Sequence, residues 1–268
     1  FIYEDSHYGF SEGLIPMKRE GRWAFLNSKG EEVIKPSFTS ALSFHEGLCV
    51  VSDGSGYGLI DTEGQWVLKP FRKSSFLRVN SGMVKKRVGK KWCFLNNDGN
   101  QAFPREYEYV HSLSEGFAGV QDSKSFRWGV IDTKGEYVVK PQFSDLSLYG
   151  FREGLCGARD RETGKWGFIN TRGEFIIKPQ FGRIFHFSEG LCGAAAGVDD
   201  GTGWKEQKWG FVDRGGQWVI KPAYDVVWDF REGLCKVNLN DRWGFVDGNG
   251  SIAVPLIYNE VDSFQNGL

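Results

Sequence analysis

The sequence has almost no excess of charge of either sign. Thirty-three Lys and Arg stand against thirty-four Asp and Glu, which leaves a formal net charge of -1. Nucleic acids and anionic membranes attract proteins through an excess of cations, so neither partner is expected. Long apolar runs are also lacking, since none approaches the roughly 20 residues that span a bilayer. We therefore expect a soluble chain without a membrane span.

Metal-ligating and catalytic patterns are scarce as well. There is no Cys-x-x-Cys, and the four His residues (His7, His45, His111 and His186) are scattered, so no zinc site is expected. No phosphate-binding loop, nucleophile elbow or His-Glu-x-x-His is present. Clustered His, Asp and Ser are also missing. The sequence predicts no enzyme, no cofactor and no metal.

What the chain does have is turn formers and aromatic residues. It contains 36 Gly, 10 Trp, 9 Tyr and 22 Phe, but only 2 Met. Aromatic side chains favour strands and Gly favours turns. The composition therefore predicts an all-β protein.

An internal repeat organises these residues. An aromatic residue followed by a small one recurs seven times at spacings of 34 to 43 residues, with Asn or Asp four positions on and Gly seven positions on. The aromatic residues are Trp23, Tyr57, Trp92, Trp128, Trp166, Trp209 and Trp243. A Pro closes each copy, and a Phe-x-Glu-Gly-Leu element precedes the aromatic, most clearly at 44–48, 151–155, 187–191 and 230–234. The chain is thus predicted to contain seven copies of one unit.

The motif explains how one unit folds. Residues 166–170 and 175–179 have strand-like patterns, and Pro179 closes the second strand because it cannot continue a ladder. Between them, Asn170 opens a tight turn and Gly173 supplies the positive φ that ends it. A third strand precedes this hairpin. A segment like 224–230, with apolar residues at every third position, is predicted to be a fourth, irregular strand or a single tight turn.

The run 165–181, Lys-Trp-Gly-Phe-Ile-Asn-Thr-Arg-Gly-Glu-Phe-Ile-Ile-Lys-Pro-Gln-Phe, followed by Phe-Ser-Glu-Gly-Leu at 187–191, resembles the WG-repeat (KWG repeat) family. The resemblance covers essentially the whole chain. The third copy departs most, with Cys93 in place of the Gly and no Lys before Pro104. The resemblance implies a repeat module, mostly without an assigned activity.

Two architectures fit such units: a seven-bladed β-propeller-like fold, which we favour, and an open β-solenoid or superhelical hairpin array. Either predicts one repeat domain over residues 1–268. Its units are expected at about 12–45, 46–80, 81–114, 115–152, 153–188, 189–231 and 232–265. The ends look like ordinary segments between repeats, so the chain either closes on itself or belongs to a longer array or complex.

Recurring residues are expected to serve the unit. Cys49, Cys156, Cys192 and Cys235 each follow the Leu of Gly-Leu, where copy four has Ala118, and are interpreted as small core residues. Such unpaired thiols favour a reducing, cytoplasmic compartment, although localisation itself is left open. The Asx-x-x-Gly turns lack the alternating carboxylates of a calcium loop.

Charges also recur in phase. A Glu precedes Gly in six copies and a Lys precedes Pro in five, among them Glu153 and Lys178. They could form charged rings facing a ligand channel. We favour a structural role, in which each Glu pairs with a Lys or binds turn amides of a neighbouring repeat.

Function is expected where the repeats differ. The loop Ala196 to Gln207 carries Trp204 and lengthens copy six, and residues 85–91 form a basic patch in copy three, interpreted as a solvated hairpin. Four aromatic residues share one strand position that Glu32 or Gln101 occupies elsewhere: Trp66, Tyr137, Phe175 and Trp218. These four and Trp204 are the candidate binding residues, with a core role between sheets as the equal alternative for the four.

The sequence therefore favours a non-catalytic scaffold for protein-protein interaction. A carbohydrate or cell-envelope binding module is the alternative, with the same aromatic residues as its contact points. An enzyme with a site in a central channel is the third and least supported hypothesis.

Overall fold

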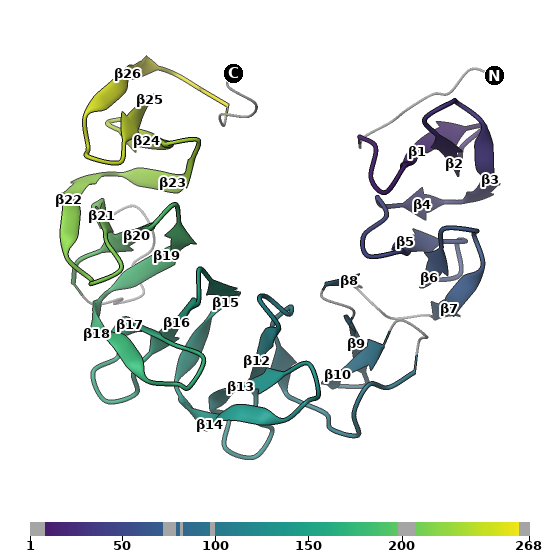
Figure 1. The fold of residues 1–268 in the computed structure, drawn as a ribbon, viewed down its shortest axis with the longest axis horizontal. Coiled ribbons are helices and arrows are strands. Elements are labelled where there is room, and N and C mark those ends of the chain that lie inside the picture. Colours follow the sequence, from purple (N-terminus) through teal and green to yellow (C-terminus); the bar gives the residue numbers. More distant parts are fainter. Residues whose placement is uncertain (1–8, 72–78, 81–82, 97–99, 198–206, 263–268) are drawn as a thin grey trace. The chain divides into compact units, whose positions relative to one another are not determined.

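The computed structural model describes residues 9–71, 79–80, 83–96, 100–197 and 207–262. These residues form 26 β-strands in seven antiparallel sheets of three or four strands, in which strands consecutive along the chain pair with one another (Figure 1). No helix in the described residues is long and apolar enough to cross a membrane. The all-β prediction is confirmed.

We number the sheets 1 to 7 along the chain. Sheets 1 to 3 contain β1 (Leu14–Arg19), β2 (Arg22–Asn27) and β3 (Glu32–Phe38); β4 (Ser40–Ala41), β5 (Leu48–Ser52), β6 (Tyr57–Asp61) and β7 (Trp66–Phe71); and β8 (Val79–Asn80), β9 (Met83–Val88) and β10 (Lys91–Asn96). Sheets 4 and 5 contain β11 (Tyr109–Val110), β12 (Phe117–Gln121), β13 (Trp128–Asp132) and β14 (Tyr137–Phe143); and β15 (Asp145–Arg152), β16 (Leu155–Arg159), β17 (Trp166–Ile169) and β18 (Phe175–Phe181). Sheets 6 and 7 contain β19 (Arg183–Ser188), β20 (Leu191–Ala195), β21 (Trp209–Val212) and β22 (Trp218–Tyr224); and β23 (Val226–Arg231), β24 (Leu234–Leu239), β25 (Arg242–Asp247) and β26 (Ile252–Tyr258).

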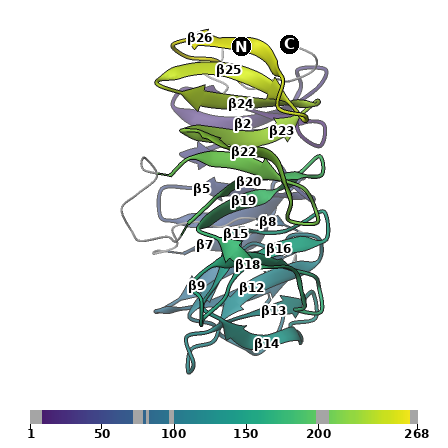
Figure 2. The ribbon, with the colours of Figure 1, turned by 90° about the vertical axis from the view of Figure 1, so that its left-hand side faces the viewer.

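The chain divides into two compact units, Phe1–Leu113 and Ser114–Leu268. The boundary falls beside the junction expected between the third and fourth repeats. Each unit is described by itself, and the single seven-repeat domain expected from the sequence stays a prediction. In the second unit the sheets follow one another in chain order, as the view onto this unit shows (Figure 2).

The core lies between neighbouring sheets. Between sheets 5 and 6, for example, Phe168 and Ile177 pack with Phe187 and Val212, all buried. Similar apolar clusters join sheets 1 and 2, 2 and 3, 4 and 5, and 6 and 7. Because neighbouring sheets within each unit bury their apolar side chains against one another, the repeats of a unit depend on one another for their stability.

The Gly after the aromatic residue is required by a close approach of two backbones. A Cβ atom on Gly167 would lie 2.4 Å from the carbonyl oxygen of Ile177 and 2.8 Å from the nitrogen of Pro179. The pairing of β17 with β18 shifts register at this point, so the fourth strand crosses directly over the Gly. The other Trp-Gly and Tyr-Gly pairs have the same contact.

Both predicted turns are present. Asn170 Oδ1 accepts hydrogen bonds from the N–H groups of Arg172 and Glu174, which confirms the Asx turn. In the Glu-Gly turns both residues have positive φ, 52° for Glu115 and 82° for Gly116, as the two-residue type I′ hairpin loop requires.

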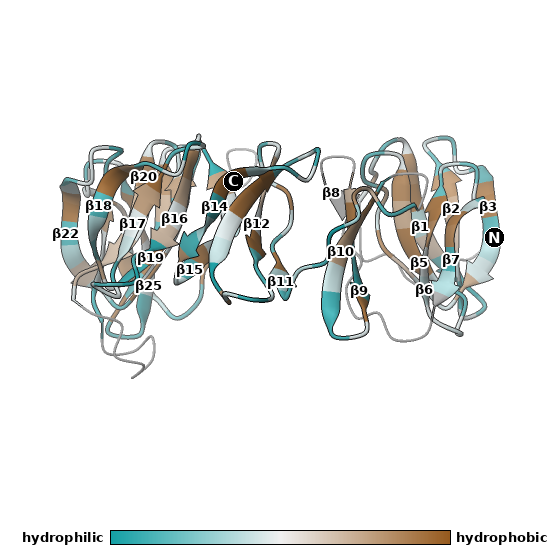
Figure 3. Ribbon diagram, turned by 90° about the horizontal axis from the view of Figure 1, so that it is seen from below, coloured by the Kyte–Doolittle hydropathy of each residue, from teal (hydrophilic) through white to brown (hydrophobic). Residues whose placement is uncertain are grey.

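In each four-stranded sheet the fourth strand lies at one edge. In β18 the exposed residues Ile176 and Lys178 alternate with the buried Ile177 and Phe181. Figure 3 shows the resulting change from apolar to hydrophilic colour along β18 and β22. Lys and Pro on an edge strand oppose pairing with another chain, so the recurring Lys-Pro protects the edge.

Candidate functional site

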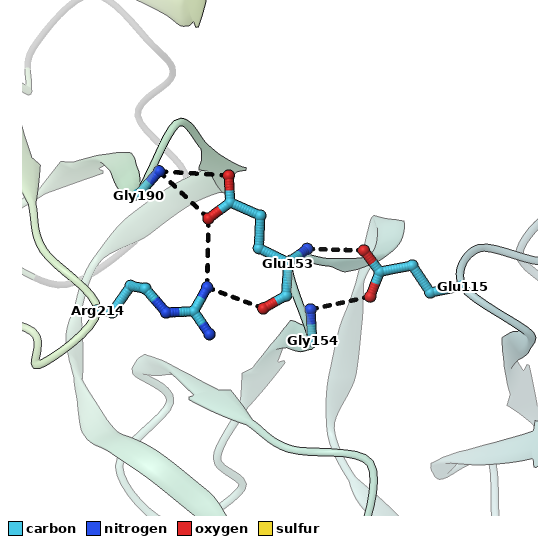
Figure 4. Close-up of polar contacts among 5 residues, drawn as sticks. All are labelled: Glu115, Glu153, Gly154, Gly190 and Arg214. Carbon is cyan, nitrogen blue, oxygen red and sulfur yellow. Dashed lines mark hydrogen bonds and ion pairs between the residues drawn. The ribbon is translucent and has the colours of Figure 1, made fainter.

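Several of the recurring Glu residues connect one repeat to the next. Glu115 accepts hydrogen bonds from the N–H groups of Glu153 and Gly154 at 2.7 and 2.9 Å (Figure 4). Glu189 does the same for the following turn, with Glu232 and Gly233 as donors at 2.7 and 2.9 Å. The interpretation that Glu binds turn amides of the neighbouring repeat is confirmed.

Glu153 belongs to the same series but has an additional partner. It accepts from the N–H of Gly190, and its carboxylate lies 3.2 Å from Nη1 of Arg214. The same guanidinium donates to the Glu153 carbonyl oxygen at 2.8 Å (Figure 4). The carboxylates of Glu115, Glu153 and Glu189 therefore support the fold.

The recurring cysteines also have a structural role. All five cysteines are free and buried. The thiols of Cys49 and Cys235 donate to the carbonyl oxygens of Leu42 and Trp228, both at 3.0 Å. Burial raises the pKa of each of these two thiols to about 12. The core interpretation is confirmed, and the thiol adds a donor that Ala at this position lacks.

The four aromatic residues predicted from one strand position begin the fourth strand of their sheets. Three of them pack edge to face on a Phe of the preceding repeat. The pairs are Trp66 with Phe38, Phe175 with Phe143 and Trp218 with Phe181, at ring-centre distances of 5.7, 5.6 and 5.7 Å. Tyr137 is half-buried at the same place in β14. This placement favours the core alternative.

The other two variable regions are only partly described. Trp204 and residues 198–206 of its loop lie outside the described residues. The basic patch is the β9–β10 hairpin, where Lys85 and Arg87 lie over the ring of Trp92, at 5.7 and 6.0 Å from its centre. The hairpin interpretation of the basic patch fits these contacts.

A different set of variable residues comes together on the first strands of sheets 5, 6 and 7. Each first strand has a β-bulge between its two core positions, in β15 between Leu146 and Phe151, in β19 between Ile184 and Phe187 and in β23 between Val227 and Phe230. A bulge redirects the residues that it contains. Since β15 contacts β19 and β19 contacts β23, the three bulges are neighbours.

The bulge residues form a continuous row across three repeats. The rings of Tyr149 and His186 lie 4.6 Å apart, and Nε2 of His186 lies 3.4 Å from Oδ2 of Asp229. Leu148 and Trp228 stand next to these residues in the sequence and are 69% and 51% exposed. We call Leu148, Tyr149, His186, Trp228 and Asp229 the bulge row.

The imidazole of the bulge row is kept neutral. Burial lowers the pKa of His186, and the positive charges of Arg152 and Arg231 act in the same direction, while Asp229 and Glu153 oppose them. Its Nδ1 is buried and has no hydrogen-bond partner among the described residues. The His186 side chain therefore packs between two repeats rather than acting as a charged ligand.

Sequence reasoning missed the bulge row, although a signal for it was present. The two residues before the large apolar residue that leads into the Glu-Gly turn vary among copies, as Leu42-Ser43, His111-Ser112, Phe185-His186 and Trp228-Asp229. Variation at a fixed phase between conserved apolar positions is the pattern expected of a surface displayed by a repeat scaffold. In the described residues no group of three His, Cys, Asp or Glu could hold a metal ion.

Solved structures resemble the chain in fold. The crystal structure of a eukaryotic initiation factor is 10% identical, with a TM-score of 0.61 over 96% of this chain and 76% of that one. Hsv2 from Kluyveromyces lactis is 8% identical, with a TM-score of 0.50 over 90% and 92% of the two chains. At such identities the likeness concerns the fold alone, and no curated protein matches the sequence. The propeller-like fold class is confirmed.

The family comparison agrees with the repeat. The model described as "WG containing repeat" matches residues 23–55, 57–70, 88–123, 128–162, 166–195, 209–243 and 243–268. These segments include the Trp-Gly pairs, the Asx turns and the Lys-Pro edges whose structural roles are given above. The chain belongs to the WG-containing repeat family.

Proposed function

We propose that this chain is a non-catalytic scaffold for protein-protein interaction and that the bulge row is a contact surface. The observation that carries this proposal is the exposure of Leu148 and Trp228 beside the packed Tyr149 and His186. Large apolar side chains on a rigid support are typical anchors of protein interfaces. The β-sheets beneath supply the rigidity.

The environment of the bulge row supports a non-catalytic role. His186 and Asp229 could orient one another for acid-base work, but a nucleophile would have to be within reach. Cys192, which pairs with the first strand of the same sheet, is buried, and burial raises its pKa well above the ordinary value. The Ser188 hydroxyl donates to the Phe230 carbonyl oxygen at 2.8 Å. Both groups are engaged in the fold.

The test is a comparison of three baits by quantitative mass spectrometry of bound proteins. The baits are the wild-type chain, a Leu148→Ser/Trp228→Ala variant and a control variant, Ile176→Ser. The control removes an exposed apolar side chain from the edge strand β18 instead. The three baits are first matched for thermal stability. We expect specific partners of the wild type to be lost at least ten-fold with the bulge-row variant and retained with the control. Retention by both variants would rule out the bulge row as the contact surface.

The loop Ala196 to Gln207 is proposed as a second contact region, on the basis of its extra length in copy six. Its deletion belongs in the same experiment as a separate bait. We expect weaker partner binding without a change in thermal stability. If every partner is recovered unchanged, the loop and its Trp204 are not a contact region.

Carbohydrate binding is the alternative function. Sugars stack on an open aromatic face, and the exposed Trp228 offers one. However, the Lys236 amino group lies 4.7 Å from the centre of the Trp228 ring and covers that side. The protein partner is therefore preferred. Glycan-array binding that Trp228→Ala or Trp66→Ala abolishes would reverse this preference.

A further inference from the structure

The bulge row has unpaired cations on both sides. Arg152 in β15 and Arg231 in β23 hold the same place, between the core Phe and the Glu of the Glu-Gly turn. Both are exposed, and neither forms a hydrogen bond or ion pair with the described residues. Arg152 follows Tyr149 by three residues in β15, and Arg231 follows Asp229 by two residues in β23, so both arginines lie on strands that carry the bulge row.

The carboxylates in the same region are already engaged. Glu153 is held by the Gly190 N–H and by Arg214, and Glu189 by the N–H groups of Glu232 and Gly233. Asp229 lies beside His186. The first two of these carboxylates are thus bound by the protein, whereas Arg152 and Arg231 are exposed. The two exposed arginines therefore offer positive charge to a partner.

The chemistry of the surface then specifies its occupant. Arginine binds carboxylates through two parallel hydrogen bonds. The exposed Leu148 and Trp228 offer apolar contacts on the same strands, β15 and β23. We propose that the bulge row binds an acidic peptide segment of a partner protein, in which carboxylates meet Arg152 and Arg231 and an apolar side chain packs on Leu148 and Trp228. This inference rests on the proposed function and adds the chemical class of the partner.

The probes are three fluorescein-labelled peptides of equal length, measured by fluorescence anisotropy with the full chain. One alternates Glu and Phe, the second has Lys in place of Glu, and the third has Ser in place of Phe. We expect the Glu-Phe peptide to bind at least ten-fold more tightly than either of the others. Its affinity should fall as salt rises, because exposed charges are screened. Equal or tighter binding of the Lys peptide, or no binding by any peptide, would overturn the proposal.

Two charge-reversal variants locate the site. Arg152→Glu/Arg231→Glu should weaken the Glu-Phe peptide at least ten-fold. Arg161→Glu/Arg172→Glu changes the net charge equally at two exposed hairpin residues outside the bulge row and should alter binding less than two-fold. If the two variants weaken binding of the Glu-Phe peptide equally, the attraction is non-specific and the proposed site is wrong. Circular dichroism melting curves confirm that both variants are folded.

A sulfated oligosaccharide serves as the competing class of ligand. If it binds more tightly than the Glu-Phe peptide and depends on the same arginines, the peptide assignment is wrong. Failure of this inference is distinguishable from failure of the proposed function. If partners are lost with Leu148→Ser/Trp228→Ala but not with Arg152→Glu/Arg231→Glu, the bulge row is still the contact surface, but its partner is not acidic.

Discussion

The carboxylate of Glu115 accepts a hydrogen bond from the backbone N–H of Glu153, the residue that holds the same place in the next repeat. Glu115 has a φ of 52°, a left-handed conformation that costs a non-Gly residue about 1–2 kcal/mol. The type I′ turn requires this conformation, and Gly or Asn would adopt it more easily. The recurrence of Glu is explained by the bond to the next repeat.

Replacing Glu115 by Asn separates these two effects. Asn tolerates a positive φ, but its side chain is too short to reach the next turn. We expect the variant to lose about 1 kcal/mol of unfolding free energy, because two hydrogen bonds to a charged acceptor are lost near the surface. Urea denaturation followed by Trp fluorescence measures the loss.

Glu20 provides the matched control. It has the same φ of 52°, but its side chain is exposed and makes no hydrogen bond to the described residues. Glu20→Asn should therefore leave stability unchanged or raise it slightly. An equal loss in both variants would show that the carboxylate of Glu115 does not join the repeats.

Gly167→Ala tests the close approach of the fourth strand. The added Cβ would meet the Ile177 carbonyl oxygen at 2.4 Å, and a backbone atom cannot move aside as a side chain can. Overpacking of this kind costs about 1–3 kcal/mol. A lower melting temperature is expected. Copy one carries Ala24 at this position, so Ala24→Gly is the reverse control and should cost at most about 1 kcal/mol through backbone flexibility.

The buried thiols should be unreactive in the folded protein. Burial raises the pKa of Cys156 to about 12, and the thiolate is the reactive form. All five cysteines are buried. We expect a disulfide-exchange reagent at pH 8 to modify none of them within minutes in the native state and all five in denaturant. Rapid modification of one native thiol would contradict the core assignment for that residue.

The pH dependence of stability should include a contribution from His186. Its pKa in the folded protein lies below the ordinary value of 6.5, so between these two values the unfolded chain binds more protons. The contribution of His186 to the unfolding free energy is therefore fully present above about pH 6.5 and is lost as the pH falls through this window. We expect the melting temperature to fall less steeply with decreasing pH in His186→Gln than in the wild type.

His45 is the control for this experiment, because its side chain is 61% exposed. His45→Gln should retain the pH dependence of the wild type. The groups around His186 (Tyr149, Arg152, Glu153, Asp229 and Arg231) are unchanged in both variants. Identical pH profiles for His186→Gln and the wild type would show that the imidazole is not held neutral by the fold.

The sequence by itself determined the repeat, the hairpin turns and the strand edges. These features are local: the Asn170 side chain binds N–H groups two and four residues away. Backbone conformation at such positions depends on neighbouring residues, so a pattern in the sequence is sufficient to predict it. The prediction that Pro179 closes its strand was wrong, because β18 continues to Phe181, which pairs with Trp166.

Only the tertiary structure decided which side chains meet. The partner of Glu115 lies 38 residues away, and Phe175, for which the sequence left a surface role and a core role equally open, packs on Phe143 of the preceding repeat. Tyr149, His186 and Asp229 come from three different repeats. The stacking of sheets brings such residues together, and the bulges in the first strands turn them outward. Neither the stacking distance nor the direction of a bulge is encoded in the spacing of residues along one strand.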